Sequence, residues 1–456
     1  MARRLVILNV VGLTESHIGK NMPHIHKYMK QSSLTSLIPP LPAVTSTVQS
    51  SIITGTSPIE HGIVANGWHE RETHETYFWR QSNDLVQGEK IWDILHKEIP
   101  EFTVANLFWW FNMYSSANIS VTPRPIYCAN GRKIPDIWTS PTSLRKTLQD
   151  KLGQFPLFNF WGPMANIKST QWIVDATLEV DKNYKPTLTL VYLPHLDYPL
   201  QKFGPKHPCI AKELQAVDHE VGRLIDHFQQ QGAQVCILSE YGIEDVSGAV
   251  AINQILRQNN WLEVREELGR EYLDAGASDA FAVADHQVAH LYVKEKSNIN
   301  TIASVLRKTD GIEFVYVGEA RGELAHERCG DIVIVSTSDR WFSHDWWINE
   351  SKAPDYQATV NIHAKPGYDP RELFFAKGWR GSKARIAMKL LLKKLGSHTL
   401  LDVITLDSSR VRGSHGRTPE MGAPSPILIA PTCAKKMPQS LPSAALKNLI
   451  YSWISS

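Results

Sequence analysis

The feature that most limits the fold of this chain is a set of short, uninterrupted apolar runs separated by helical patterns. These runs are "RLVILNVV" (Arg4 to Val11), "PTLTLVYLP" (Pro186 to Pro194) and "AQVCILSE" (Ala233 to Glu240). Runs that are apolar on both faces are typical of strands inside a parallel sheet. A long amphipathic pattern, residues 210–232, separates the last two runs, and strand, helix, strand is the order of a βαβ unit. The sequence therefore predicts an α/β fold with a mostly parallel central sheet.

A hydroxyl-rich stretch, "LPAVTSTVQSSIITGTSPIEHGIVANGW", runs from Leu41 to Trp68. Its "VQSSIITG" portion predicts a helix that ends at Gly55, a residue suited to the left-handed C-terminal cap. Thr45, Ser46 and Thr47 then fall at the helix start. Hydroxyl residues at this position often satisfy the free backbone N–H groups. The other interpretation is a nucleophile aimed by a helix N-terminus.

The regular alternation loosens after the third run. Shorter strand patterns such as "AFAVADHQVAHLYV" and "GDIVIVS" are separated by loops. We therefore expect a core α/β region in residues 1–243, an inserted cap-like subdomain in 244–400, and the final part of the core in 401–456. The core is expected to resume near "TLLDVITL" (residues 399–406) and to finish with the strand "SPILIA" (residues 425–430).

Charge and composition exclude several classes of partner and location. The net charge is only +2 and no basic block stands out, so composition offers no case for nucleic acid or a membrane surface as partner. The N-terminal apolar run lacks a cleavage site and is interpreted as a first strand rather than a signal peptide. No segment approaches the roughly 18 apolar residues of a membrane span. We expect a cytoplasmic protein, and the five scattered cysteines favour neither a disulfide framework nor a cysteine metal site.

Polar residues follow the predicted strands at the points where they end. His195, Asp197 and Gln201 follow the second apolar run, and Glu240 and Tyr241 close the third. Ligands of open α/β sheets gather at the carboxyl ends of strands. A further candidate, His415, lies in the glycine-flanked loop "RGSHGRTPEMG".

The hydroxyl-rich stretch resembles the nucleophile region of the nucleotide pyrophosphatase/phosphodiesterase branch of the alkaline phosphatase superfamily. Later pieces of the family pattern follow in order: Asp197 before Gly204-Pro205, Glu240-Tyr241-Gly242, and His415-Gly416. The resemblance implies an alkaline-phosphatase-like three-layer sandwich with an inserted cap, and Thr45 as the nucleophile. The pattern of the nucleophile region falls on Pro42, Thr45, Thr54, Gly55, Pro58, His61, Gly62, Ile63 and Asn66.

The same resemblance implies two divalent metals, which activate the nucleophile and neutralise charge on the phosphate oxygens. The family usually holds them with three Asp, three His and the Thr oxygen, and this chain departs from that set. Asp197, Gln201 and His415 are left for one site, and Thr45, Glu240 and Tyr241 for the other. Fewer imidazoles favour oxygen ligands, so we expect one or two ions of Mg²⁺, Mn²⁺ or Ca²⁺ rather than a zinc pair. The departures are Val11 for Asp, Gln201 for His, Glu240-Tyr241 for Asp-His, and Val48 for an Asn near the phosphate.

Other residues could compensate, although each is more often structural. The surroundings of His286 and His290 favour strands over a helix, and His61 is expected to brace a turn. Where the family often has an aromatic residue after the nucleophile, this chain has Ser46, and a tryptophan could replace it. The candidate ligands are Asn9, His195, Asp285, His286 and His290, and the candidate tryptophans are Trp68, Trp79, Trp109 and Trp110.

Two functions remain open. The first is a metal-dependent hydrolase that cleaves phosphodiester or pyrophosphate bonds through Thr45. The second is a catalytically degenerate relative that binds a phosphorylated ligand or partner without hydrolysis. Both predict a phosphorylated small molecule at Thr45.

Overall fold

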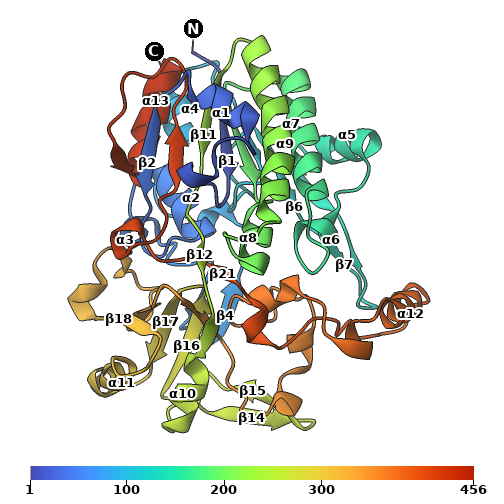
Figure 1. The fold of residues 1–456 in the computed structure, drawn as a ribbon, viewed down its shortest axis with the longest axis vertical. Helices are drawn as coiled ribbons and strands as arrows, with labels where there is room; N and C mark the ends of the chain where they lie inside the picture. The colour runs from blue at the N-terminus through green and yellow to red at the C-terminus, as the bar shows by residue number, and fades with distance from the viewer. Residues whose placement is uncertain (1, 456) are drawn as a thin grey trace.

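A nine-stranded sheet forms the centre of the protein, seen in a computed structural model that describes residues 2–455 (Figure 1). Its strand order is β23-β2-β22-β11-β1-β10-β5-β6-β9, and five of the eight neighbouring pairs are parallel. The predicted α/β fold with a mostly parallel sheet is confirmed. The strands are β1 (Leu5–Val10), β2 (Leu34–Ile38), β5 (Val104–Leu107), β6 (Ile119–Pro123), β9 (Ile137–Ser140), β10 (Leu188–Leu193), β11 (Gln234–Leu238), β22 (Ile427–Ile429) and β23 (Ser440–Pro442).

The three apolar runs of the sequence are the three central strands. All six residues of β1 are buried, as expected for a strand covered on both faces. β1 lies between β10 and β11 and pairs in parallel with both, with Leu5 opposite Leu188 and Gln234. Their carboxyl ends therefore meet at one edge of the sheet, where the polar residues that follow them are brought together.

Helices cover both faces of this sheet, which gives three layers (Figure 1). On one face α7 packs on β5 and β10, and α9 packs on β11. On the other face α13 contacts both α2 and α4. The first layer is α1 (Pro23–Met29), α5 (Ser143–Leu152), α7 (Lys168–Tyr184) and α9 (Ile210–Gln230); the second is α2 (Thr45–Thr54), α4 (Ile91–Glu98) and α13 (Leu446–Ser455).

A separate four-stranded antiparallel sheet, in the order β16-β17-β19-β18, lies within the region predicted as an insertion. It has its own apolar core, to which α10 and α11 contribute Ile252 and Ile302. The domain boundaries themselves stay a prediction. The elements are α10 (Ile252–Gln258), β16 (Ala280–Asp285), β17 (Val288–Val293), α11 (Ile299–Leu306), β18 (Ile312–Val317) and β19 (Ile332–Ser336).

One expected element is different. Residues 399–406 add no strand to the nine-stranded sheet, and Ile404 instead forms an isolated bridge with Phe375. The apolar residues of this segment make a local contact instead of a sheet strand. The chain rejoins the nine-stranded sheet only at β22. Just before this segment, α12 (Lys383–Lys394) lies at the outer edge of the molecule (Figure 1).

Small hairpins and short helices connect these parts. Within residues 2–455, no helix combines the length and apolar character needed to cross a membrane. The connecting elements are α3 (Pro58–His61), β3 (Gly67–Glu70), β4 (Glu75–Phe78), β7 (Ile126–Tyr127), β8 (Lys133–Ile134), α6 (Leu157–Phe160), α8 (Asp197–Phe203), β12 (Glu244–Asp245), β13 (Gly248–Ala251), β14 (Val264–Glu267), β15 (Arg270–Leu273), β20 (Arg340–Ser343) and β21 (Gly413–Ser414).

Candidate active site

Thr45 is the first residue of α2. Val44 before it is extended, with φ −130°, and Gly55 ends the helix with φ +69°, as predicted. The Thr45 side chain is 2% exposed, and its hydroxyl lies 3.2 Å from the Tyr241 hydroxyl. A helix N-terminus presents free N–H groups and the positive end of the helix dipole. Thr45 therefore lies where a phosphate group would be stabilised.

Glu240 is fully buried just beyond the end of β11. Its Oε1 accepts hydrogen bonds from the side-chain amides of Asn9, on β1, and of Gln49, one turn after Thr45 on α2. Burial outweighs these contacts and raises the pKa of Glu240 to about 8. Glu240 is therefore a carboxyl group that gains and loses its proton near neutral pH.

Asp197 and Gln201 lie one turn apart on α8. Asp197 Oδ2 accepts from the Gln201 amide at 2.7 Å, and Asp197 Oδ1 accepts from the Tyr241 hydroxyl at 3.2 Å. The Gln201 carbonyl in turn accepts from the Tyr368 hydroxyl at 2.9 Å. Burial raises the pKa of Asp197 to about 7. Both ends of the Gln201 amide are thus engaged within the protein.

His415 completes the cluster from the far end of the chain. Its Nδ1 donates to the Ala43 carbonyl at 2.8 Å, so Nε2 is left facing Asp197 Oδ1 at 3.8 Å. The His415 ring stacks on Tyr241, with centroids 3.5 Å apart. Burial holds the pKa of His415 well below its usual range, which keeps the imidazole neutral.

The turn between β16 and β17 covers this cluster. His286, with φ +61°, lies in that turn, and its ring is 3.8 Å from the His415 ring. Its Nδ1 is 2.7 Å from Asp285 Oδ1, and its buried Nε2 has no partner. Asp285 also accepts from the backbone and side-chain amides of Asn66, whose carbonyl oxygen accepts from Ser46 N. Asn66 therefore ties the first turn of α2 to the four-stranded sheet.

The remaining candidate ligands lie outside the cluster or brace turns. His195 Nε2 contacts Glu213 on α9 at 2.7 Å, and the His290 Nδ1 accepts from the Gly330 backbone. His61 lies between the Ser51 hydroxyl and the Ile63 backbone N–H, as expected for a residue that braces a turn. Of the tryptophans, Trp110 donates its backbone N–H to the Gln49 carbonyl, which fixes that amide.

These residues do not fit a pair of metals. Among residues 2–455, no group of three or more His, Cys, Asp or Glu side chains is placed to hold a metal ion. Val11 is buried and apolar, and side-chain amides already occupy one oxygen of Asp197 and one of Glu240. Glu240 Oε2 and Asn9 Oδ1 lack partners, but two oxygens fall short of the six or more that Mg²⁺ or Ca²⁺ takes.

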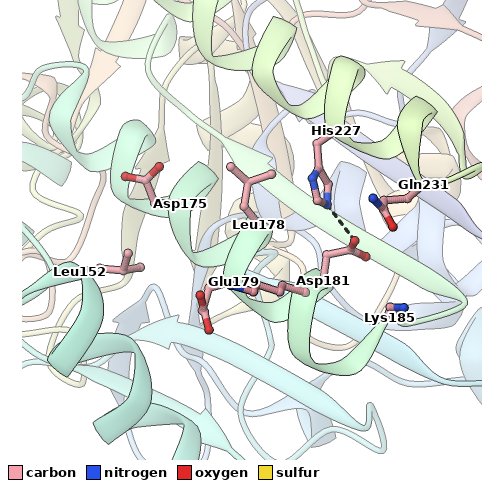
Figure 2. A pocket seen from close by; sticks show the side chains of 9 residues that line it. Leu152, Asp175, Leu178, Glu179, Asp181, Lys185, His227 and Gln231 are labelled. Atoms are coloured by element: carbon pink, nitrogen blue, oxygen red, sulfur yellow. Dashed lines mark hydrogen bonds and ion pairs between the residues drawn. The ribbon is translucent and has the colours of Figure 1, made fainter.

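A hollow of about 560 Å³ lies elsewhere, on the helical layer between α7 and α9 (Figure 2). His227 and Asp181 form a 2.8 Å contact there, and Asp181 also binds Arg4. None of the candidate site residues lines this hollow. We interpret its charged groups as ion pairs that join the two helices.

Sequence reasoning missed Gln49 and Tyr368. Gln49 lies four residues after Thr45, so helical spacing alone places both on one face of α2 and could have indicated it. Tyr368 reaches Gln201 from the other end of the chain, and no local pattern marks it.

The sequence of the chain is similar to those of proteins from one known family. The family model described as type I phosphodiesterase / nucleotide pyrophosphatase matches residues 5–369. Ectonucleotide pyrophosphatase/phosphodiesterase 1 of Saccharomyces cerevisiae is 23% identical over 397 residues, which cover 80% of this chain and 46% of the yeast protein. An uncharacterised pyrophosphatase/phosphodiesterase of Schizosaccharomyces pombe is 24% identical over 220 residues, 46% of this chain and 38% of that protein. This chain thus spans less than half the length of these two relatives.

Solved structures show the same fold. Murine ectonucleotide pyrophosphatase/phosphodiesterase 5, an inactive variant in complex with AMP, has a TM-score of 0.61 at 14% identity, covering 100% of this chain and 95% of that chain. The human protein of the same name has a TM-score of 0.59 at 13% identity, covering 99% and 95%. The predicted alkaline-phosphatase-like fold is confirmed.

Proposed function

Because the chain belongs to the type I phosphodiesterase / nucleotide pyrophosphatase family, we propose that it hydrolyses phosphodiester or pyrophosphate bonds with Thr45 as the nucleophile. The observation that carries this proposal is the position of the Thr45 hydroxyl at the start of α2, 3.2 Å from the Tyr241 hydroxyl. The buried Glu240 carboxyl is held by Gln49, one turn further along the same helix. A nucleophile, a base and the donors of a helix N-terminus are the parts that phosphoryl transfer needs.

The chemistry follows from these contacts. Thr45 Oγ1 bonds to phosphorus, the bond to the leaving oxygen breaks, and the threonine proton passes to the ionised Glu240 carboxylate. With its pKa raised to about 8, Glu240 is a stronger base than an exposed carboxylate. The leaving oxygen takes a proton from water. The hydroxide that remains displaces Thr45 from phosphorus, and the Thr45 oxygen recovers its proton from Glu240.

No step of this proposal passes through a metal, because the donors do not fit the pair that the family uses. One or two ions of Mg²⁺, Mn²⁺ or Ca²⁺, on Asp197, Gln201 and His415 and on Thr45, Glu240 and Tyr241, stay a prediction of the sequence. A cytoplasmic location also stays a prediction. For the substrate, the AMP in the murine structure supports a nucleotide or similar phosphorylated small molecule as the first class to test.

The second candidate is a protein that binds a phosphorylated ligand without hydrolysis, and the family match favours hydrolysis over it. Amide donors at Asp197 and Glu240 occupy oxygens that a metal would need, and at neutral pH both buried carboxyls retain part of their protons. Such a site still offers the donors of α2 to a phosphate.

Hydrolysis of bis(p-nitrophenyl) phosphate separates the two candidates. The assay compares wild type, Thr45→Val and the matched control Thr47→Val. Thr47 lies in the same helical turn as Thr45, and its buried hydroxyl has no hydrogen-bond partner. We expect Thr45→Val to lose about a hundredfold or more in kcat and Thr47→Val to retain activity. If the wild-type protein is inactive but still binds AMP in calorimetry, hydrolysis is rejected and the binding function is retained. Equal activity of all three proteins would remove Thr45 as nucleophile.

A further inference from the structure

The helix α12 presents an apolar face to solvent. Ala384, Ala387, Met388, Leu391, Leu392 and Leu395 recur at a spacing of three and four, so they share one side of the helix and of the residue that follows it. None of the twelve helical residues is buried. The exposed fractions are 49% for Met388, 57% for Leu391, 39% for Leu392 and 75% for Leu395.

The charged side of α12, in contrast, holds the helix to the protein. Arg385 forms two 2.8 Å contacts with the Asp402 carboxylate, and Lys389 contacts the same carboxylate. Arg385 also donates to the Arg380 carbonyl at 2.8 Å. A surface helix of a globular protein normally turns its apolar face inward. Here that orientation is reversed, because Arg385 and Lys389 are held against the protein and the apolar face is exposed.

Basic residues surround this apolar face. Residues 377–398 contain seven Lys or Arg and no Asp or Glu, although the whole chain is nearly neutral. Within the part of the chain that the structure describes, Lys383 and Lys394 form no ion pair, and Lys394 lies beside the apolar face at the helix end. Trp379, just before the helix, is 65% exposed.

We propose that α12 and Trp379 form a docking surface for anionic lipid membranes. Leucines on one face, lysines beside them and a tryptophan at the end are the combination that lies in the headgroup region of a bilayer. An acidic protein groove is the other partner for a basic amphipathic helix. The membrane fits better because α12 is already fixed along its charged side, and a planar surface needs only the remaining face. This inference is independent of the proposed hydrolase.

Co-sedimentation with vesicles tests the proposal. The full chain is mixed with two kinds of vesicle. One contains phosphatidylcholine alone, and the other also contains about 30% of the anionic lipid phosphatidylglycerol. We expect binding to the anionic vesicles only, and loss of that binding in high salt because lipid charges are then screened. Wild type that stays in the supernatant with anionic vesicles overturns the proposal.

Two variants and their controls locate the surface. Leu391→Asp/Leu392→Asp and Lys383→Glu/Lys394→Glu should each weaken binding by about tenfold or more. The controls are Leu268→Asp, at a fully exposed leucine, and Lys27→Glu/Lys308→Glu, at two exposed lysines. All substituted side chains lie at the surface, and thermal unfolding verifies that each variant is folded. Equal binding of wild type and the α12 variants would overturn the assignment, as would a wild-type dimer that the leucine variant dissociates.

Discussion

The ring of His415 lies parallel to the ring of Tyr241, with 3.5 Å between centroids and 5° between planes. Tyr241 also contacts the Thr45 hydroxyl and Asp197 Oδ1 through its own hydroxyl. One aromatic side chain thus joins three residues that come from opposite ends of the chain.

Tyr241→Phe keeps the ring on His415 and removes only the hydroxyl. We expect a loss of about 1 kcal/mol of stability from the missing hydrogen bonds, and a larger relative loss of phosphodiester hydrolysis. Tyr241→Ala also removes the stack and should cost about 3–5 kcal/mol. Urea unfolding and the bis(p-nitrophenyl) phosphate assay measure the two effects. Unchanged activity in the Phe variant would show that the contact with Thr45 has no part in hydrolysis.

Glu240→Gln should alter the pH dependence of stability. Burial raises the pKa of Glu240 in the folded protein to about 8 from its ordinary value of 4.5, so the folded state binds the proton more tightly than the unfolded state. The corresponding stabilisation is complete below pH 4.5 and is lost as the pH rises through 8. The variant lacks this group, so its unfolding free energy should fall less between pH 5 and 9, by on the order of 4 kcal/mol.

Denaturant unfolding at several pH values measures this difference. Asp197, whose pKa is raised to about 7, contributes in the same direction and remains in the variant, so a part of the slope persists. The control is Glu319→Gln, at an exposed carboxyl. Identical slopes for wild type and Glu240→Gln would contradict the raised pKa.

Gln201→His should create a metal site. Asp197 Oδ1 and His415 Nε2 already lie 3.8 Å apart, and an imidazole at position 201 adds a third ligand and removes the amide that now holds Asp197. We expect about one zinc per chain in the variant after dialysis, by elemental analysis, and much less in wild type. Gln201→Asn serves as the control. Stoichiometric zinc in wild type would instead restore the metal-dependent mechanism.

Asn66→Ala should weaken the link between α2 and the four-stranded sheet. The substitution leaves the Asp285 carboxylate and Ser46 N each without one partner in a buried setting. Such losses cost about 1–3 kcal/mol each. Hydrogen exchange should then increase in the first turn of α2 and in the β16–β17 turn together. Faster exchange confined to α2 would show that the two parts are not coupled through Asn66.

The sequence was sufficient for those parts of the fold and site that depend on local pattern. Buried apolar runs predicted β1, β10 and β11, and the hydroxyl run with Gly55 predicted α2 and the place of Thr45. Because strand ends in a parallel sheet meet at one edge, the positions of Asp197 and Glu240 followed as well.

The parts that the sequence did not predict depend on contacts distant in the chain. Two sets of hydrogen bonds become visible only in the assembled fold, where the carboxyl ends of the strands meet. They join Gln201 to Tyr368, and Glu240 to Gln49 and Asn9. The pattern of residues 399–406 resembles a strand, but in the structure Ile404 forms only an isolated bridge with Phe375. The averaged charge of the chain also concealed the basic segment around α12, which a local count of charges reveals.

The β16–β17 turn has a consequence for the rate at which a ligand binds. Thr45, Asp197, Glu240, Tyr241 and His415 are each at most 7% exposed, and His286 rests on His415. Because these residues are buried, a part of the structure has to move before a ligand reaches Thr45, and we expect the β16–β17 turn to be that part. The observed rate of association should then stop rising at high ligand concentration. Its plateau should equal the rate at which the turn opens. The four-stranded sheet, which carries this turn, would then set the timing of ligand entry to the residues that follow the strands of the nine-stranded sheet.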